Sequence, residues 1–290
     1  MTKLEKKIDF ALIISAKKCN PNGDPLIENR PRTDYNSFGE ISDVCLKRKI
    51  RNRLQNAGEN IFIQSQDDAQ DDCKSLSERY NKFWNEEKPK SNEVVIKACE
   101  KWIDVRTFGQ VFAFKKFEKN SNKEETKAKG ESKASRGPLS IQTATSIDPV
   151  IITTMQIVKS VNSEPSEGKS SDTMGAKHRV EFGLYKTFGS INVDLAEKTG
   201  FSYEDAQKIK KALISLFKND ASSARPEGSM EVVKVVWWEH NCASGQYSSA
   251  KVHNLLEINK KVDGSPNRPE DYEIKVNSLP NLKGEVLDGE

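Results

Sequence analysis

The chain has 290 residues, of which 35% are hydrophobic and 31% are charged, a length that suits one large domain or two ordinary ones. Its formal net charge is only +3, from 46 Lys and Arg against 43 Asp and Glu, which excludes polyanion binding through a strongly basic overall composition. The five cysteines are scattered without a C-x-x-C pair, so we expect neither a disulfide framework nor a zinc site.

The first predicted element is a strand over residues 8–16, where a nearly continuous apolar run is typical of a strand buried on both faces. The run is too short to span a membrane and no cleavage site follows it. We therefore expect no signal peptide, no membrane contact and a cytoplasmic location. The proline and Asn-Gly content of residues 20–25, Asn-Pro-Asn-Gly-Asp-Pro, then predicts tight turns.

A helix is predicted next, with Ser42 as its N-cap and an end near Gly58. Residues 47–53, Lys-Arg-Lys-Ile-Arg-Asn-Arg, contain no acid, so the apolar stripe of this helix is flanked by cations on both sides. The stripe consists of Leu46, Ile50, Leu54 and Ala57. Lys47 and Arg51 flank it on one side, Lys49 and Arg53 flank it on the other, and Arg48 points most nearly away from the core.

Residues 59–100 form a polar, acidic segment that we interpret as an insertion, with helices near residues 75–84 and 92–99. Within it, residues 67–72 read Asp-Asp-Ala-Gln-Asp-Asp. We prefer a solvated acidic loop, or a contact to a basic partner, over a metal site here. Separated runs of opposite charge suit a subunit that binds a polyanion on one face and a protein elsewhere.

Residues 102–114 return to strand or buried-loop character, whereas residues 115–136 have almost no apolar side chains and are a low-complexity loop. Two β-rich stretches follow at 139–161, interrupted by Asp148-Pro149, and at 178–191. We expect these two stretches to be joined by a protruding polar hairpin at about 162–177.

The clearest helix is predicted over residues 202–217, where Ser202 and Asp205 approximate a capping box. A strong strand follows at 230–239, and its Trp237 and Trp238 are expected in the core. The tail beyond residue 260 is broken by Pro and Asn, with one possible edge strand near Tyr272–Val276.

The predicted order is strand, helix, strand, strand, helix, strand. This is the α+β, ferredoxin-like (RRM-like) β-α-β-β-α-β plan, with helices on one side of an antiparallel sheet. RNA-recognition modules share this plan, but the aromatic pattern of the common RNA-recognition motif is missing from the sequence. If RNA binds, its backbone rather than its bases provides most of the contacts.

Catalytic patterns are also missing. The three histidines, His178, His240 and His253, lie in no H-x-E or H-E-x-x-H pattern, and there is no G-x-S-x-G, P-loop or G-x-G-x-x-G motif. We therefore expect no enzyme, no catalytic residue, no cofactor and no metal site.

The basic helix does not stand alone. Arg30 and Arg32 lie in a loop just upstream, and the helix start at Ser42 offers backbone N–H groups to an anion. A second basic group, Lys177-His178-Arg179, closes the predicted hairpin. Solvated charge is the alternative interpretation for each group, and the sequence alone leaves it open.

Several motifs in combination resemble the CRISPR type I-C (Dvulg subtype) Cascade backbone subunits, the seventh Cas family. The resemblance runs from about residue 7 to 258. The matching segments begin at Asn20 (Asn-Pro-Asn-Gly-Asp-Pro), Arg30 (Arg-Pro-Arg-Thr-Asp), Ser42 (Ser-Asp-Val-Cys-Leu-Lys-Arg-Lys-Ile-Arg-Asn), Asp104 (Asp-Val-Arg-Thr-Phe-Gly), Arg136 (Arg-Gly-Pro), Lys177 (Lys-His-Arg-Val-Glu-Phe-Gly-Leu-Tyr), Ala221 (Ala-Ser-Ser-Ala-Arg-Pro-Glu-Gly-Ser-Met) and Gln246 (Gln-Tyr-Ser-Ser-Ala-Lys-Val-His).

The resemblance implies one RRM-like palm domain over residues 1–260, with finger insertions at 59–100 and 113–137, a β-hairpin thumb at about 160–178, and a C-terminal tail at 261–290. It also implies a non-catalytic subunit that stacks in several copies along a CRISPR guide RNA for antiviral defence. Base pairing with a target DNA strand would then read the sequence. The other implied partners are the large, small and repeat-handle-binding subunits of the complex.

The same resemblance assigns guide-backbone contacts to the basic helix and a base-displacing wedge to the thumb. The residues that we predict to contact RNA are Arg30, Arg32, Ser42, Lys47, Arg48, Arg51, Met174, Lys177, His178 and Arg179.

Two alternatives stay open. One is an endoribonuclease that cuts a precursor guide with His178 as its general acid or base. The other is a purely structural polymer, in which the basic helix meets the acidic segment 67–72 of a neighbouring copy.

Overall fold

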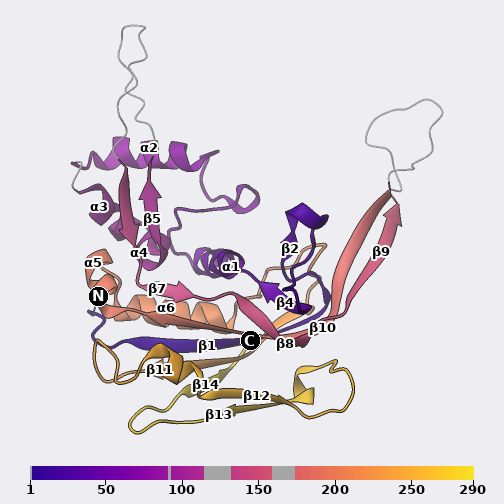
Figure 1. Cartoon of the computed structure of the whole chain (residues 1–290). Helices are drawn as coiled ribbons and strands as arrows, with labels where there is room; N and C mark the ends of the chain where they lie inside the picture. The colour runs from indigo at the N-terminus through magenta and orange to yellow at the C-terminus, as the bar shows by residue number, and fades with distance from the viewer. Residues whose placement is uncertain (1, 91–92, 114–131, 159–173) are drawn as a thin grey trace, which may run out of the picture.

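The computed structural model describes residues 2–90, 93–113, 132–158 and 174–290 (Figure 1). Its centre is a large antiparallel sheet, so the expected α+β class is confirmed. In sheet order the strands are β14 (Glu285–Asp288), β11 (Met230–Glu239), β1 (Ile8–Cys19), β10 (Met174–Ile191), β8 (Ala144–Pro149) and β4 (Phe38–Ile41). β7 (Leu139–Ile141) and β9 (Ile152–Val158) also pair with β10.

The β1 strand lies between β11 and β10 and is buried on both faces, as its apolar run predicted. Phe10 and Leu12 point into one hydrophobic cluster, and Ala11 and Ile13 point into another, because successive side chains of a strand alternate. The strand extends three residues beyond the predicted end at residue 16.

Different elements pack against the two faces of the main sheet (Figure 1). Helices α1 (Asp43–Asn56), α5 (Val193–Thr199) and α6 (Tyr203–Ile214) contribute to the cluster on one face. On the other face lie α7 (Ser249–His253) and the ribbon formed by β12 (Leu256–Lys260) and β13 (Tyr272–Val276). Trp237 and Trp238 are both buried in the core, as expected, and pack in the clusters on opposite faces of the sheet.

The two main helices follow the predicted signals. Ser42 caps α1 by accepting a hydrogen bond from the backbone of Cys45, and α6 begins with the predicted capping box of Ser202 and Asp205. α6 ends at Ile214, three residues before the predicted end. The prediction that Ala57 belongs to the apolar stripe of α1 was wrong, because Ala57 is the C-cap residue and is exposed.

The insertion contains the two expected helices, α2 (Leu76–Glu87) and α3 (Val94–Lys101). Despite its polar composition it has an aromatic core of its own, in which Phe62 packs against Trp102 and Phe112. A 3-10 turn at Gln66–Asp68 lies within the acidic segment.

Strand or buried-loop character was predicted for residues 102–114, and this was wrong for the first half. Residues 103–108 form the helix α4 (Ile103–Phe108), followed by β5 (Gly109–Phe112), which pairs with β6 (Lys133–Arg136). Tertiary contacts override the β-branched composition here, because the helical turn directs Asp104 and Arg106 to ion-pair partners on different elements.

The β-rich stretch 139–161 is divided into β7, β8 and β9, and β8 ends at the predicted interruption by Asp148 and Pro149. β9 and β10 form a long hairpin that projects from the sheet, with Val158 opposite Met174 at its described end (Figure 1). Met174–Lys177 therefore belong to a strand and not to the connecting loop. Residues 114–131 and 159–173, on which most of the predicted low-complexity loop and the hairpin tip fall, lie outside the described residues.

The last thirty residues join the main structure. The predicted edge strand at Tyr272–Val276 is confirmed as β13, which pairs with β12. β14, for which no signal was recognised, pairs with β11 and forms one edge of the main sheet. The remaining short elements are β2 (Gly23–Asp24), β3 (Arg30–Pro31) and the 3-10 turns Pro25–Ile27 and Pro269–Asp271. In the described ranges, no helix is long and apolar enough to cross a membrane.

Helix α4 fixes the insertion to α1 and α6. Arg106 donates two hydrogen bonds to Asp205 of α6, at 2.9 and 2.8 Å, and both side chains are buried. Asp104 accepts from Arg51 of α1 at 3.1 Å and from the backbone N–H groups of Phe62 and Ile63. One short helix is thereby tied to α1 and α6 at once.

We predict that Arg106→Ala lowers the free energy of unfolding by about 3–5 kcal/mol, because it leaves the buried Asp205 carboxylate unpaired. Urea unfolding measures this change. Lys3→Ala, which breaks the exposed pair with Glu197, is the control and should leave the midpoint unchanged. Equal midpoints for Arg106→Ala and the wild type would contradict the role of α4.

A second buried polar group joins β1, β11 and α7. His240 lies 2.8 Å from Asp9, and Lys7 lies 3.2 Å from the same carboxylate. His253 Nε2 is 3.7 Å from the other Asp9 oxygen. Burial lowers the pKa of His253 below its ordinary value of 6.5, although the Asp9 charge opposes that shift.

Because the folded-state pKa of His253 is lowered, the unfolded chain takes up the proton first as the pH falls. We predict that the contribution of His253 to the free energy of unfolding is at its maximum above about pH 6.5 and declines as the pH falls below that value. His253→Gln should show a smaller decline over the same window in urea titrations. A decline as steep as that of the wild type would assign it to other groups.

Candidate nucleic-acid interface

The start of α1 is joined to the turn-rich segment before it. Asn22 accepts hydrogen bonds from the backbone N–H and from the hydroxyl of Ser42, at 2.9 and 2.8 Å. The Ser42 hydroxyl in turn accepts from the backbone of Cys45. Ser42 thus fixes the helix start, and its own N–H is already engaged.

Arg30 lies on β3, which pairs with β2 in a small ribbon beside α1, and Arg32 directly follows this strand. The Arg32 guanidinium lies 3.4 Å from the Asp24 carboxylate. Arg30 is exposed and makes no ion pair with a described residue. Of Arg30 and Arg32, only Arg30 therefore carries a charge without a carboxylate partner among the described residues.

Two of the predicted contact residues on α1 already pair with carboxylates of the same chain. Lys47 pairs with Asp43, one turn earlier, at 2.9 Å and near the surface. The Arg51 side chain is only 12% exposed, pairs with Asp104, and lies over the Phe108 ring with 4.7 Å between its Cζ atom and the ring centroid. Burial lowers the Arg51 pKa and Asp104 counteracts this, so Arg51 joins α1 to α4 rather than projecting into solvent.

Arg48 lies on the face of α1 that points away from the core, as helical spacing predicted. Its Nε atom donates to Asn52 at 3.1 Å, and it makes no ion pair with a described residue. This face lines a cleft of about 530 Å³ between α1, residues 65–68 and residues 219–225. We call it the α1 cleft. Arg225, which also lines it, was missed as a site residue, although the motif from Ala221 was noticed.

The members of the predicted basic group of the hairpin, residues 177–179, point to opposite faces of β10, because successive side chains of a strand alternate. Lys177 and Arg179 lie on one face of β10, whereas Met174 and His178 lie on the opposite face. Lys177 is half-buried and has no ion-pair partner in the described chain. Arg179 lies 3.3 Å from Glu181.

The face with Met174 and His178 looks toward the β2–β3 ribbon across a cavity of about 570 Å³. Met174 is 66% exposed. His178 is buried; its Nδ1 lies 2.9 Å from the Thr154 hydroxyl and its Nε2 lies 3.9 Å from Glu28 of the ribbon. The Thr154 hydroxyl therefore holds the ring, and no described carboxylate lies within hydrogen-bond distance of either ring nitrogen.

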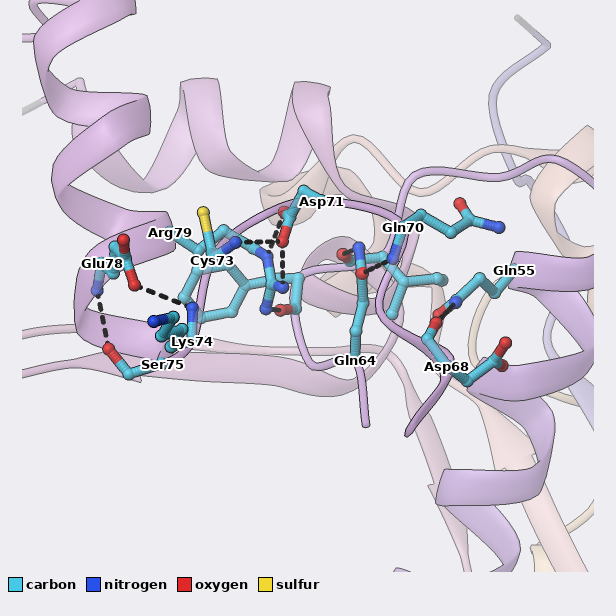
Figure 2. Close-up of polar contacts among 12 residues, drawn as sticks. Gln55, Gln64, Asp68, Gln70, Asp71, Cys73, Lys74, Ser75, Glu78 and Arg79 are labelled. Carbon is cyan, nitrogen blue, oxygen red and sulfur yellow. Dashed lines mark hydrogen bonds and ion pairs between the residues drawn. The ribbon is translucent and has the colours of Figure 1, made fainter. Parts of the chain in front are cut away.

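The acidic segment is engaged within its own chain (Figure 2). Asp71 pairs with Arg79 at 2.6 Å, Gln64 accepts from the backbone of Gln70, and Gln55 of α1 donates to the carbonyl of Asp68. Within the described ranges, no group of three or more His, Cys, Asp or Glu side chains could hold a metal ion. These contacts fix the segment beside α1 of the same copy and leave Asp67 and Asp68 exposed.

The start of α1, the ribbon and the hairpin face with Met174 and His178 therefore form one surface, whereas Lys177 and Arg179 lie on the other face of the hairpin and Arg51 is buried against α4. Asn22 links the β2–β3 ribbon to the start of α1, and Glu28 of the ribbon approaches His178 of the hairpin. Figure 1 shows the ribbon between α1 and the β9–β10 hairpin. We call this the α1–hairpin surface.

The comparisons with known proteins agree on a family. A family model described as CRISPR-associated protein Cas7 matches residues 6–277. A protein named CRISPR-associated protein Cas7 from Haloferax volcanii is 25% identical over 313 aligned positions, covering 99% of this chain and 85% of that protein.

Two solved structures are also similar to the chain. One, described as a CRISPR RNA-guided surveillance complex, pre-nicking, has a TM-score of 0.46 and 12% identity over 80% of this chain and 78% of its own. The other, described as a CRISPR RNA-guided surveillance complex, has a TM-score of 0.41 and 15% identity over 80% of this chain and 68% of its own.

The different environments of Arg48 and Arg51 lead to a prediction about stability. Arg51→Ala should lower the free energy of unfolding by about 3 kcal/mol or more, because Asp104 loses its buried partner. Arg48→Ala should change it by less than about 0.5 kcal/mol. Parallel urea titrations compare the two, and equal losses would contradict the assignment of Arg51 to the α4 contact.

Proposed function

The chain belongs to the CRISPR-associated Cas7 family, and from this membership we propose that it is a non-catalytic guide-RNA-binding subunit of a Cascade surveillance complex of type I-C. Several copies assemble along the spacer part of the guide and present it for pairing with a target DNA strand, as part of antiviral defence. The observation that carries the proposal is the family match over residues 6–277, which includes every predicted contact residue.

The proposed palm has the ferredoxin-like plan. In chain order its elements are β1, α1, β8, β10, α6 and β11, and in the sheet the four strands follow the order β11, β1, β10, β8. Both orders support a split β-α-β arrangement, since each helix connects strands that are not neighbours in the sheet. Such a sheet gives the RNA contacts a rigid base.

The insertions around the palm are assigned by the same family membership. The segments 59–100 and 113–137 form the fingers, and the aromatic core around Phe62 supports an independent folding unit for the first of them. The β9–β10 hairpin, including residues at about 160–178, forms the thumb. Residues 261–290 form the C-terminal segment, whose β14 completes the sheet.

The proposed RNA path follows the α1–hairpin surface. Arg30 and Arg48 provide cations without ion-pair partners in the described residues, and Lys177 provides another on the opposite face of the hairpin. The weak surface pairs of Arg32 and Lys47 can open toward a phosphate. Ser42 and Arg51 hold α1 in position. Met174, exposed at the described end of the hairpin, is the proposed wedge between guide bases, with His178 and Arg179 at the hairpin base.

The division of labour between RNA and protein follows from these contacts. Phosphate contacts fix the path of the guide without reading its sequence, so base pairing with the target DNA strand reads the sequence. The remaining proposed partners are further copies of the chain and the large, small and repeat-handle-binding subunits of the complex.

A salt titration tests the proposal. We predict that the chain binds a fluorescein-labelled oligouridylate with an affinity that falls steeply between about 50 and 200 mM salt. Arg48→Gln with Lys177→Gln should weaken binding about tenfold and reduce the slope of log K against log salt by about 1.4, from about 0.7 per lost phosphate contact on a single strand.

Lys275→Gln is the matched control, because Lys275 is exposed on β13 on the other side of the sheet. It should bind as the wild type does. A flat salt profile for the wild type, or equal losses for the double variant and the control, would argue against a phosphate path along this surface.

A further inference from the structure

The motif from Ala221 to Met230 has no role in the surface described so far, although it lies beside α1. Its loop, between α6 and β11, is anchored at both ends to the end of β1. The backbone N–H of Asn20 donates to the carbonyl of Ala224 at 2.9 Å, and the N–H of Lys17 donates to the carbonyl of Ser229 at 2.8 Å. Gly228, with φ of +74°, closes the turn in a conformation that favours glycine. The loop is therefore held rigidly against the palm.

This loop and α1 share a group of three charged side chains, of which Lys49 is buried and Asp220 and Arg225 are half-buried. Lys49, only 4% exposed, donates to Asp220, and the same carboxylate oxygen lies 3.4 Å from Nε of Arg225. Burial lowers the pKa of Lys49, and Asp220 counteracts that effect. One carboxylate thus faces two cations, so the trio carries a net charge of one positive unit, and that surplus lies with Arg225 at the wall of the cleft.

Arg48 and Arg225 both line the α1 cleft and are both held through Nε, by Asn52 and Asp220 respectively. Each guanidinium has five N–H donors, and the terminal nitrogens of both have no hydrogen bond to any described residue. Two half-buried guanidinium groups in one cleft, each already fixed at one atom, are preorganised for an anion with several acceptor oxygens.

The opposite wall of the same cleft is acidic. It is formed by residues 65–68, which Gln55 holds against α1 through the Asp68 carbonyl. Figure 2 shows the Asp68 carboxylate turned away from that hydrogen bond. The carboxylates of Asp67 and Asp68 are exposed and repel any anion that enters beside Arg48 and Arg225.

Building on the proposed function, we propose that Arg225 and Arg48 together hold one phosphodiester of the bound single-stranded RNA in the α1 cleft, and that Asp67 and Asp68 weaken this contact from the opposite wall. The acidic wall orients the strand as well. Its phosphates face the arginines, on the side away from the carboxylates of residues 65–68.

Fluorescence anisotropy with a labelled oligouridylate tests this in the full-length chain. Arg225→Gln should weaken binding about fivefold and reduce the salt slope by about 0.7, the share of one phosphate contact. Asp67→Asn with Asp68→Asn should strengthen binding about threefold, since repulsion is removed while the exposed side chains keep their size. Lys275→Gln should leave both quantities unchanged.

The two charge changes act in opposite directions, so the result does not depend on Arg225→Gln folding well. If the double Asp→Asn variant binds RNA as the wild type does or more weakly, or if folded Arg225→Gln keeps the wild-type slope, the cleft does not hold a phosphodiester, while the proposed function stands. If the wild type itself binds no RNA, the proposed function fails together with this inference.

Discussion

Two ion pairs on one helical turn, Arg51–Asp104 and Arg106–Asp205, join α4 to α1 and α6, which lie on the same face of the main sheet. Because Asp104 also accepts from the backbone of Phe62 and Ile63, the same turn fixes the path of the chain into the insertion. The acidic segment is thereby held beside α1, where Gln55 contacts it. The shape of the α1 cleft and the position of α1 both depend on α4, which acts through its ion pairs with α1 and α6.

Ion pairing within the chain is compatible with the proposed binding of a polyanion along one surface, even though the net charge is only +3. Most cations of α1 already have partners within the chain, which align and fix the helix, and a few cations remain uncompensated on the α1–hairpin surface. On the proposed function, a single subunit would bind with modest affinity, and several copies bound side by side on one guide would bind more tightly through avidity. Contacts directed at phosphates also keep the guide bases available for pairing.

Much of this was predictable from local patterns. The apolar run of β1, the Ser42 cap and the Ser202–Asp205 capping box each specify their element through neighbouring residues, and the structure has all three. The helix at 103–108 was not predictable, since the partners of Asp104 and Arg106 lie about fifty and one hundred residues away. The side chains of Lys177 and His178 lie on opposite faces of β10, and Arg51 is buried in its contact with α4. Neither position could be predicted from the basic motifs, because both depend on contacts with other elements.

The most direct test of the central claim is the nucleic acid that co-purifies with the chain when it is expressed beside a CRISPR array and its neighbouring genes. The account predicts intact guide RNA of uniform length, in a high-mass complex containing several copies of the chain. A wild-type chain that purifies as an RNA-free monomer, or that carries RNA cut within the guide, would contradict it.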